Sequence, residues 1–157
     1  MANSVSPMQL AEYVVKLPGH TSAVGTQVLK AEVGCVHLAV RKRPDLLQWG
    51  GIFHGGIITG LADFAAGTAV TTLLPLGRSA ITIDLHVNFL SAADGDSIIA
   101  KAKAVQVGKS ISVAGVEVFT VEEREERLCA LCMITPRNVE VPPSVMGAEP
   151  AAWAGCG

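Results

Sequence analysis

The sequence predicts an α+β domain in which one curved antiparallel sheet wraps around a single long helix. Two observations carry the prediction: an apolar run over residues 55–75 with no proline before its end, and strand-like stretches on both sides of it. The 157 residues amount to one ordinary domain. Because 50% of the residues are hydrophobic and only 4% are aromatic, small aliphatic side chains must pack helix and sheet closely together.

The segment ahead of the long helix contains the first two predicted strands. Residues 24–31 and 33–40 are apolar and rich in valine, and Glu32 separates them. Pro44 ends this region. Still earlier, residues 8–16 carry apolar side chains at helical spacing, which predicts a short amphipathic helix.

The long helix has an unusual composition. Between residues 46 and 77 the only ionisable side chains are those of His54 and Asp63. The central stretch, GGIITGLADFAAGTAVTTLLP, is small or apolar on every face, which is typical of a fully buried helix. A transmembrane helix would have a similar length. The aspartate near the middle, and the later strands that need a partner for their apolar faces, favour burial inside the domain.

Four strands are predicted after the helix. Residues 80–90 alternate, with Ile81, Ile83, Leu85, Val87 and Phe89 on one face and Thr82, Asp84, His86 and Asn88 on the other. Residues 97–107, 110–121 and 127–137 follow, joined by a Gly108-Lys109 turn and the charged tip EEREER. We expect these four strands to form an antiparallel meander. Residues 1–137 then make one domain, and residues 138–157, which lack periodicity, form an exposed or poorly ordered extension.

Charge and targeting signals exclude several classes of function. A net charge of -2 creates no field that would attract nucleic acid or an anionic membrane, so neither is an expected partner. The first 16 residues lack the basic region and apolar core of a secretion signal, so we expect a cytoplasmic protein with reduced cysteines. Cys129 and Cys132 have the C-x-x-C spacing of zinc and redox sites. On a strand they would face opposite sides, and no second pair accompanies them, so no metal site is expected.

The motifs around the helix carry a resemblance to a known family. HGGIITGLADFAAGTA, the strand TIDLHVNFL, Gly95 and the Gly108-Lys109 turn occur in the order seen in hotdog-fold thioesterases of the phenylacetate-pathway (PaaI-like) type. The resemblance covers roughly residues 20–137. It implies a hotdog fold, hydrolysis of an acyl-CoA thioester without a cofactor, and an active site shared across a homodimer, with two dimers commonly making a homotetramer.

The residues themselves support acyl chemistry. A helix that begins at Gly55 and Gly56 presents free N–H groups and a partial positive charge, which suit a thioester oxygen and its oxyanion. A plain glycine-rich helix entrance is the alternative. Asp63 lies in an apolar helix, where a carboxylate is costly unless it is paired or used. It is either satisfied by hydroxyls such as that of Thr59, or it acts as a general base or nucleophile.

Helix geometry separates His54 from Asp63. Nine residues correspond to a rise of about 13 Å and a rotation of about 900°, which places the two side chains on opposite sides of the helix. If both act on one substrate, a second copy of the chain must supply the aspartate, and a two-fold axis beside antiparallel helices would create two equivalent sites.

The resemblance implies a role for each residue that matches the family motif. The Gly55 N–H would bind the thioester oxygen, His54 would position the thioester, and the partner subunit's Asp63 would be the base or nucleophile. Gln48 stands where the family commonly has an asparagine, and Thr82 could hold a water against Asp63. Basic residues at the ends of elements are candidates for binding the phosphates of coenzyme A, although ordinary surface charges would look the same: Arg78, Lys109 and Arg137.

Two other functions fit the same fold. One is a regulatory module that binds acyl-CoA without hydrolysing it, and the intact His54 and Asp63 argue against this. The other is a hotdog enoyl-CoA hydratase, which would normally carry a differently spaced Asp and His pair. The acyl group depends on side chains near Trp49, Phe53 and Phe64 and is not given by the sequence.

Overall fold

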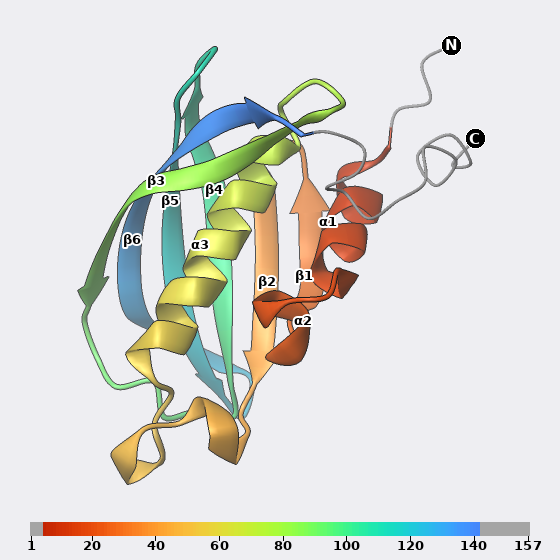
Figure 1. The fold of residues 1–157 in the computed structure, drawn as a ribbon. Helices are drawn as coiled ribbons and strands as arrows, with labels where there is room; N and C mark the ends of the chain where they lie inside the picture. The colour runs from red at the N-terminus through yellow and green to blue at the C-terminus, as the bar shows by residue number, and fades with distance from the viewer. Residues whose placement is uncertain (1–4, 142–157) are drawn as a thin grey trace.

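The computed structural model describes residues 5–141, and its architecture is the predicted α+β arrangement: a curved six-stranded antiparallel sheet with one long helix lying across its concave face (Figure 1). Two short 3₁₀ helices, at Pro44–Leu46 and Trp49–Gly51, precede the long helix. The other elements are α1 (Pro7–Lys16), α2 (His20–Ala23), β1 (Gln27–Glu32), β2 (Cys35–Arg41), α3 (Gly55–Thr71), β3 (Arg78–Phe89), β4 (Ser97–Val107), β5 (Ser112–Glu122) and β6 (Glu125–Glu140).

The strand order is β1-β2-β4-β5-β6-β3. β4, β5 and β6 are consecutive neighbours, as the predicted meander requires, but β3 pairs with β6 at the edge of the sheet rather than with β4. The prediction of a four-stranded meander was therefore correct for β4, β5 and β6 but wrong for the position of β3. Residues 90–96 connect β3 to β4, and this connection is long enough to carry the chain across the sheet. A two-residue turn would instead have forced β3 and β4 to pair with each other.

A β-bulge in β3 changes which side chains face the helix. The register shifts between Thr82 and Asp84, which leaves Ile83 as the extra residue. Thr82 therefore faces α3, whereas Ile81 and Ile83 are 57% and 55% exposed. The prediction that Ile81 and Ile83 lie on the buried face of this strand, and Thr82 on the other face, was therefore wrong. Leu85, beyond the bulge, packs against the core as expected.

The long helix α3 is buried by small side chains. Ala62, Ala65, Ala66 and Ala69 are all fully buried, which lets the helix axis approach the sheet closely. Pro75 follows the end of the helix after the C-cap Thr72. In the described part of the chain, no helix is both long enough and apolar enough to cross a membrane.

The first helix, α1, is the amphipathic helix expected near residues 8–16. Ser6 caps it, with Pro7 as the first helical residue and a reciprocal bond between Ser6 and Gln9. Ala11 and Val15 are buried on the side that packs against β1.

The final strand is longer than predicted. β6 continues to Glu140, three residues beyond the predicted end of this strand at residue 137, and the domain boundary placed there stays a prediction. Asn138 is buried at this end, where its amide donates to Gly108 O at 2.7 Å and accepts from Ser112 Oγ at 3.0 Å. These side-chain hydrogen bonds hold the last residues of β6 in the sheet. They do not depend on alternating apolar residues, so the hydrophobic pattern of the sequence did not predict this end of the strand. The remainder of the predicted extension, residues 142–157, lies outside the described residues.

A second bulge places the two cysteines of β6 together. The register skips Cys129, and both Cys129 and Cys132 are buried in the core. The prediction that they face opposite sides was therefore wrong. Burial raises the pKa of the Cys129 thiol and raises that of Cys132 to about 11. Both thiols are neutral core side chains at physiological pH.

Candidate active site

The start of α3 presents one free backbone donor. His54 is the N-cap residue, and its Nδ1 accepts a hydrogen bond of 2.9 Å from the Gly56 N–H. The Ile57 N–H donates to His54 O at 2.9 Å. Within residues 5–141 the Gly55 N–H has no acceptor. Of the two glycine N–H groups expected to bind substrate, Gly56 is occupied by the cap and Gly55 is available.

The N-cap hydrogen bond also determines which nitrogen of the exposed, neutral His54 ring carries the proton. A nitrogen that accepts from a backbone N–H carries no proton, so the neutral ring carries its proton on Nε2. The Nε2–H is therefore a hydrogen-bond donor at the same end of the helix as the Gly55 N–H.

Phe89 is a neighbour of the helix start that the sequence did not identify as a site residue. A side chain at Gly55 would place its Cβ 3.2 Å from Phe89 Cζ. The ring, at the end of β3, thus stands against the Gly55 backbone, and a Cβ at Gly55 would crowd it. The alternation over residues 80–90 identified Phe89 only as an apolar strand residue, because nothing in the sequence indicates that β3 ends beside the helix start.

Asp63 is half-buried in the middle of α3 and is held by the edge strand. Thr82 Oγ1 donates a hydrogen bond of 2.5 Å to Asp63 Oδ1. The two residues were both expected near the site, and the bulge in β3 brings them into direct contact. The carboxylate borders a cavity of about 260 Å³ whose lining includes Phe64, Gly67 and Thr68.

The loop that contains Gln48 folds back beside the helix start. Gln48 N–H donates to Ile52 O at 2.9 Å, and Leu47 and Phe53 form an antiparallel bridge on either side. Gly50 and Gly51 make the reversal with φ of 80° and 73°, a conformation that favours glycine. Gln48 thus lies in the turn that leads directly into His54.

The basic candidates gather at the opposite end of the molecule. Arg78 begins β3 shortly after the end of α3, and its Nη2 donates to Lys109 O and Asn138 O, each at 3.2 Å. Arg137 pairs with Ile81 on β3 and forms a bridge with Ile111. Arg78 therefore ties β3 to β6 and to the turn between β4 and β5. Hydrogen bonds and strand pairing connect this group of three residues near the start of β3, whereas Gly55 lies at the beginning of α3.

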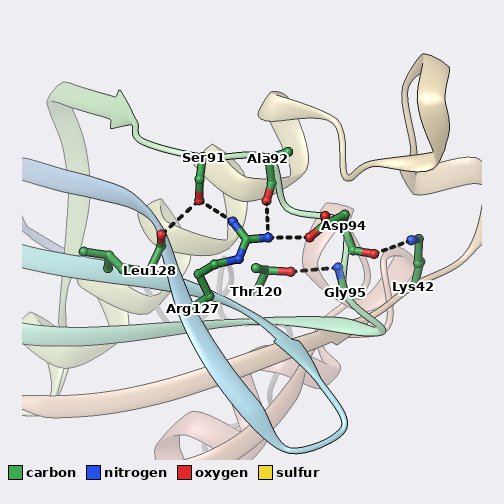
Figure 2. A network of polar contacts seen from close by, with 8 residues as sticks. All are labelled: Lys42, Ser91, Ala92, Asp94, Gly95, Thr120, Arg127 and Leu128. Atoms are coloured by element: carbon green, nitrogen blue, oxygen red, sulfur yellow. Dashed lines mark hydrogen bonds and ion pairs between the residues drawn. The ribbon is translucent and has the colours of Figure 1, made fainter.

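A polar network ties the β3–β4 connection to β6 (Figure 2). Arg127 on β6 donates to Ser91 Oγ at 2.7 Å and to Ala92 O at 3.0 Å, and pairs with Asp94 at 2.5 Å. In the same connection, Ala93 O accepts the Phe53 N–H at 2.9 Å. The network thereby supports the strand segment immediately before His54.

Gly95 completes this connection. Its N–H donates to Thr120 Oγ1 at 2.9 Å, and an added Cβ would lie 2.3 Å from Val121 O. Only glycine allows such a close approach to β5. The glycine noted in the sequence motif is thus required by packing of the connection and not by contact with a ligand.

Fold and site together define a class of protein, the hotdog-fold thioesterases. Residues 50–127 match the family model described as Thioesterase superfamily. Over 107 residues the chain is 38% identical to a protein of Halobacterium salinarum named "Putative esterase", and the match covers 65% of this chain and 70% of the relative. The chain therefore belongs to the thioesterase superfamily.

A further relative has a more specific name. The 1,4-dihydroxy-2-naphthoyl-CoA hydrolase of Listeria monocytogenes is 24% identical over 111 residues, which are 71% of this chain and 89% of that protein.

Solved structures share the fold. A thioesterase family protein from Silicibacter pomeroyi superimposes with a TM-score of 0.82 at 24% identity, covering 86% of this chain and 99% of that one. A mutant of the phenylacetic acid degradation protein PaaI from Thermus thermophilus gives a TM-score of 0.63 at 28% identity, covering 74% and 95%. The predicted hotdog fold and the resemblance to the PaaI-like thioesterases are confirmed.

Proposed function

We propose that this protein hydrolyses acyl-CoA thioesters to a free acid and coenzyme A, using residues from two copies of the chain at each active site. One observation carries the proposal: the Asp63 carboxylate is fixed by Thr82 at the border of a cavity, on a helix whose first N–H has no acceptor within residues 5–141. The name of the Listeria relative supports a CoA thioester as the substrate class.

The edge strand β3 supports a dimer. It pairs with β6 on one side, and in the sheet formed by the described residues its other side is the free edge. Ile81, Ile83 and Phe89 are each more than half exposed along it. Such an edge is suited to pairing with the same strand of a second copy about a two-fold axis. Antiparallel α3 helices would then bring the Asp63 of one copy towards the Gly55 of the other. The tetramer implied by the resemblance stays a prediction.

In the proposed reaction, the thioester oxygen accepts hydrogen bonds from Gly55 N–H and from His54 Nε2–H. These donors stabilise the negative charge that develops on this oxygen in the tetrahedral intermediate. The partner subunit's Asp63 takes a proton from a water, whose oxygen forms the new bond to the carbonyl carbon. The carbon–sulfur bond breaks as the intermediate collapses, and the proton passes to the departing thiolate.

A nucleophilic role for Asp63 uses the same groups. Its carboxylate would attack the carbonyl carbon and release the thiolate, and water would then hydrolyse the mixed anhydride. Thr82 would hold Oδ1 in either case. Oxygen-18 tracing in a single turnover distinguishes the two routes, because a nucleophilic carboxylate passes one of its own oxygens to the product.

The phosphates of coenzyme A would bind at Lys109 and Arg137. Arg78 is a weaker candidate, because its Nη2 already donates to the carbonyl oxygens of Lys109 and Asn138. An extended, flexible CoA chain needs only a few such charges at the mouth of the site.

The proposal is tested with Asp63→Asn and a matched variant, Asp84→Asn, which removes the same charge from an exposed position on β3. Thiol release from a panel of acyl-CoA substrates should fall at least a hundredfold in Asp63→Asn while CoA binding, measured by calorimetry, is retained. Asp84→Asn should keep wild-type rates. Wild-type protein that binds acyl-CoA without releasing thiol would favour the regulatory module instead.

A further inference from the structure

Asp63 lies at one end of a continuous groove beneath α1. The 260 Å³ cavity beside the carboxylate shares lining residues with a second cavity of about 470 Å³ that continues towards the C-terminal end of α3. The shared residues are Leu10, Val14, Thr71 and Ser79. We call this continuous space the α1 groove. Helix α1 forms one wall, the second half of α3 another, and the start of β3 the third.

The walls of the α1 groove are mostly apolar or small. Leu10 and Val14 are only half-buried, whereas their neighbours Ala11 and Val15 are buried against the body of the domain. Helix α1 therefore has apolar surface on the groove side that no residue of the described chain fully covers. Apolar concave surface with a small number of polar groups, here including Asp63 in one cavity and Arg78 in the other, is typical of a small-molecule site.

Gly67 widens the groove where it passes α3. A Cβ at this position would be 3.7 Å from Ala80 O, an ordinary contact, so the backbone does not require glycine here. The missing side chain leaves room between α3 and β3, next to the Asp63 carboxylate.

We propose that the α1 groove binds the acyl chain of the substrate and that Leu10 sets which chain lengths are accepted. The inference rests on the proposed function, since the reacting carbonyl must lie beside Asp63 and its acyl chain must leave in some direction. The groove is the apolar path that begins at this carboxylate. The chain end would meet Leu74 and Leu76 at the far end.

The length of the groove defines the substrate class. From Asp63 to Thr72 the helix advances about 13 Å at 1.5 Å per residue. An extended chain advances about 3.5 Å for every three bonds, so about eleven bonds fit in this length. The groove therefore suits unbranched medium-chain acyl groups of about ten to twelve carbons.

The experiment measures kcat/KM for straight-chain acyl-CoA substrates from two to sixteen carbons. The value should rise about fourfold with each added methylene, because each buries further apolar surface, and should stop rising near ten to twelve carbons. Leu10→Trp, which fills the groove, should lower kcat/KM for dodecanoyl-CoA at least ten times more than it lowers kcat/KM for butyryl-CoA. Leu10→Ala should move the optimum to longer chains.

Met8→Trp is the matched control. Met8 is on the same helix, is 36% exposed and does not line the groove. It should leave the chain-length profile unchanged. A flat profile in the wild type, a preference for aryl over all straight chains, or equal effects of Leu10→Trp and Met8→Trp would overturn the groove assignment even if thioesters are hydrolysed.

A failure of the proposed hydrolase function gives a different result from a failure of the groove assignment. If no thioester in the panel releases thiol, hydrolysis is overturned, and the groove is then tested by calorimetric titration of the same variants with decanoyl-CoA and butyryl-CoA. Tighter binding of decanoyl-CoA that Leu10→Trp abolishes would support the groove. Equal affinities for the two ligands would overturn it.

Discussion

Thr82 donates a 2.5 Å hydrogen bond to Asp63 and so joins the edge strand of the sheet to the middle of the central helix. The bond exists because a bulge at Ile83 turns Thr82 inward. A half-buried carboxylate that accepts such a bond is held in one orientation, and the same strand that would form the dimer interface also sets that orientation.

The Thr82–Asp63 bond predicts the effect of removing one hydroxyl. Thr82→Val keeps the shape of the side chain but leaves Asp63 without its donor, so kcat should fall about 10- to 100-fold, as expected for a hydrogen bond to a charged group. Thr82→Ser should retain most activity. Steady-state kinetics with one acyl-CoA substrate measure both. A Thr82→Val enzyme with wild-type kcat would show that the hydroxyl has no part in turnover.

His54 has a structural role and a proposed catalytic role that can be separated. Asparagine is a good N-cap residue, so His54→Asn should keep the bond to the helix start and the melting temperature. His54→Ala should lose about 1 kcal/mol of stability. Both variants lack the Nε2–H and should lose activity to a similar degree. The comparison uses thermal unfolding and thiol release, and an active His54→Asn enzyme would limit His54 to capping.

The buried cysteines predict a loss of stability at alkaline pH. The folded-state pKa of Cys132 is raised to about 11, above its ordinary value of 9.0, so the unfolded chain loses this proton first. The stabilisation is fully present below pH 9 and is lost as the pH rises towards 11, by roughly 1–2 kcal/mol. Urea unfolding at pH 8.5 and 10.5 measures it.

Cys132→Ala provides the control for this pH dependence. The variant is destabilised at both pH values by the lost side-chain volume, but its decrease between them should be smaller than that of the wild type. An identical decrease in the two proteins would assign the pH dependence to other groups.

The sequence predicted the elements well where hydrophobic periodicity is strong. β4 was placed over the residues that form it, and α3 was identified from small apolar residues that must be buried on every side. The sequence-based prediction failed where strand register or a side-chain hydrogen bond determines which residues face inward or where a strand ends. The bulges at Ile83 and Cys129 reverse which side chains face inward, and no spacing rule marks them. The end of β6 depends on the amide of Asn138, whose partners are Gly108, 30 residues earlier in the β4–β5 turn, and Ser112, 26 residues earlier at the start of β5.

The candidate site follows the same division. His54, Gly55 and Asp63 could be identified from one helix, because a glycine start and a buried carboxylate are chemical features of the sequence itself. Phe89 could not, since its position against Gly55 depends on where an edge strand ends in space.

The proposed sharing of each active site between two chains makes the most specific prediction, because two inactive variants should restore each other. Asp63→Asn and His54→Ala each disable both sites of a homodimer. In a mixed dimer, one site combines the intact His54 of the first chain with the intact Asp63 of the second, and the other site carries both changes. Random mixing makes half of the dimers mixed, so about a quarter of wild-type activity should return after the two variants are unfolded and refolded together. Refolding each variant alone is the control and should restore nothing. A mixture that stays inactive, while native mass spectrometry shows mixed dimers, would place both residues in a site formed by one chain.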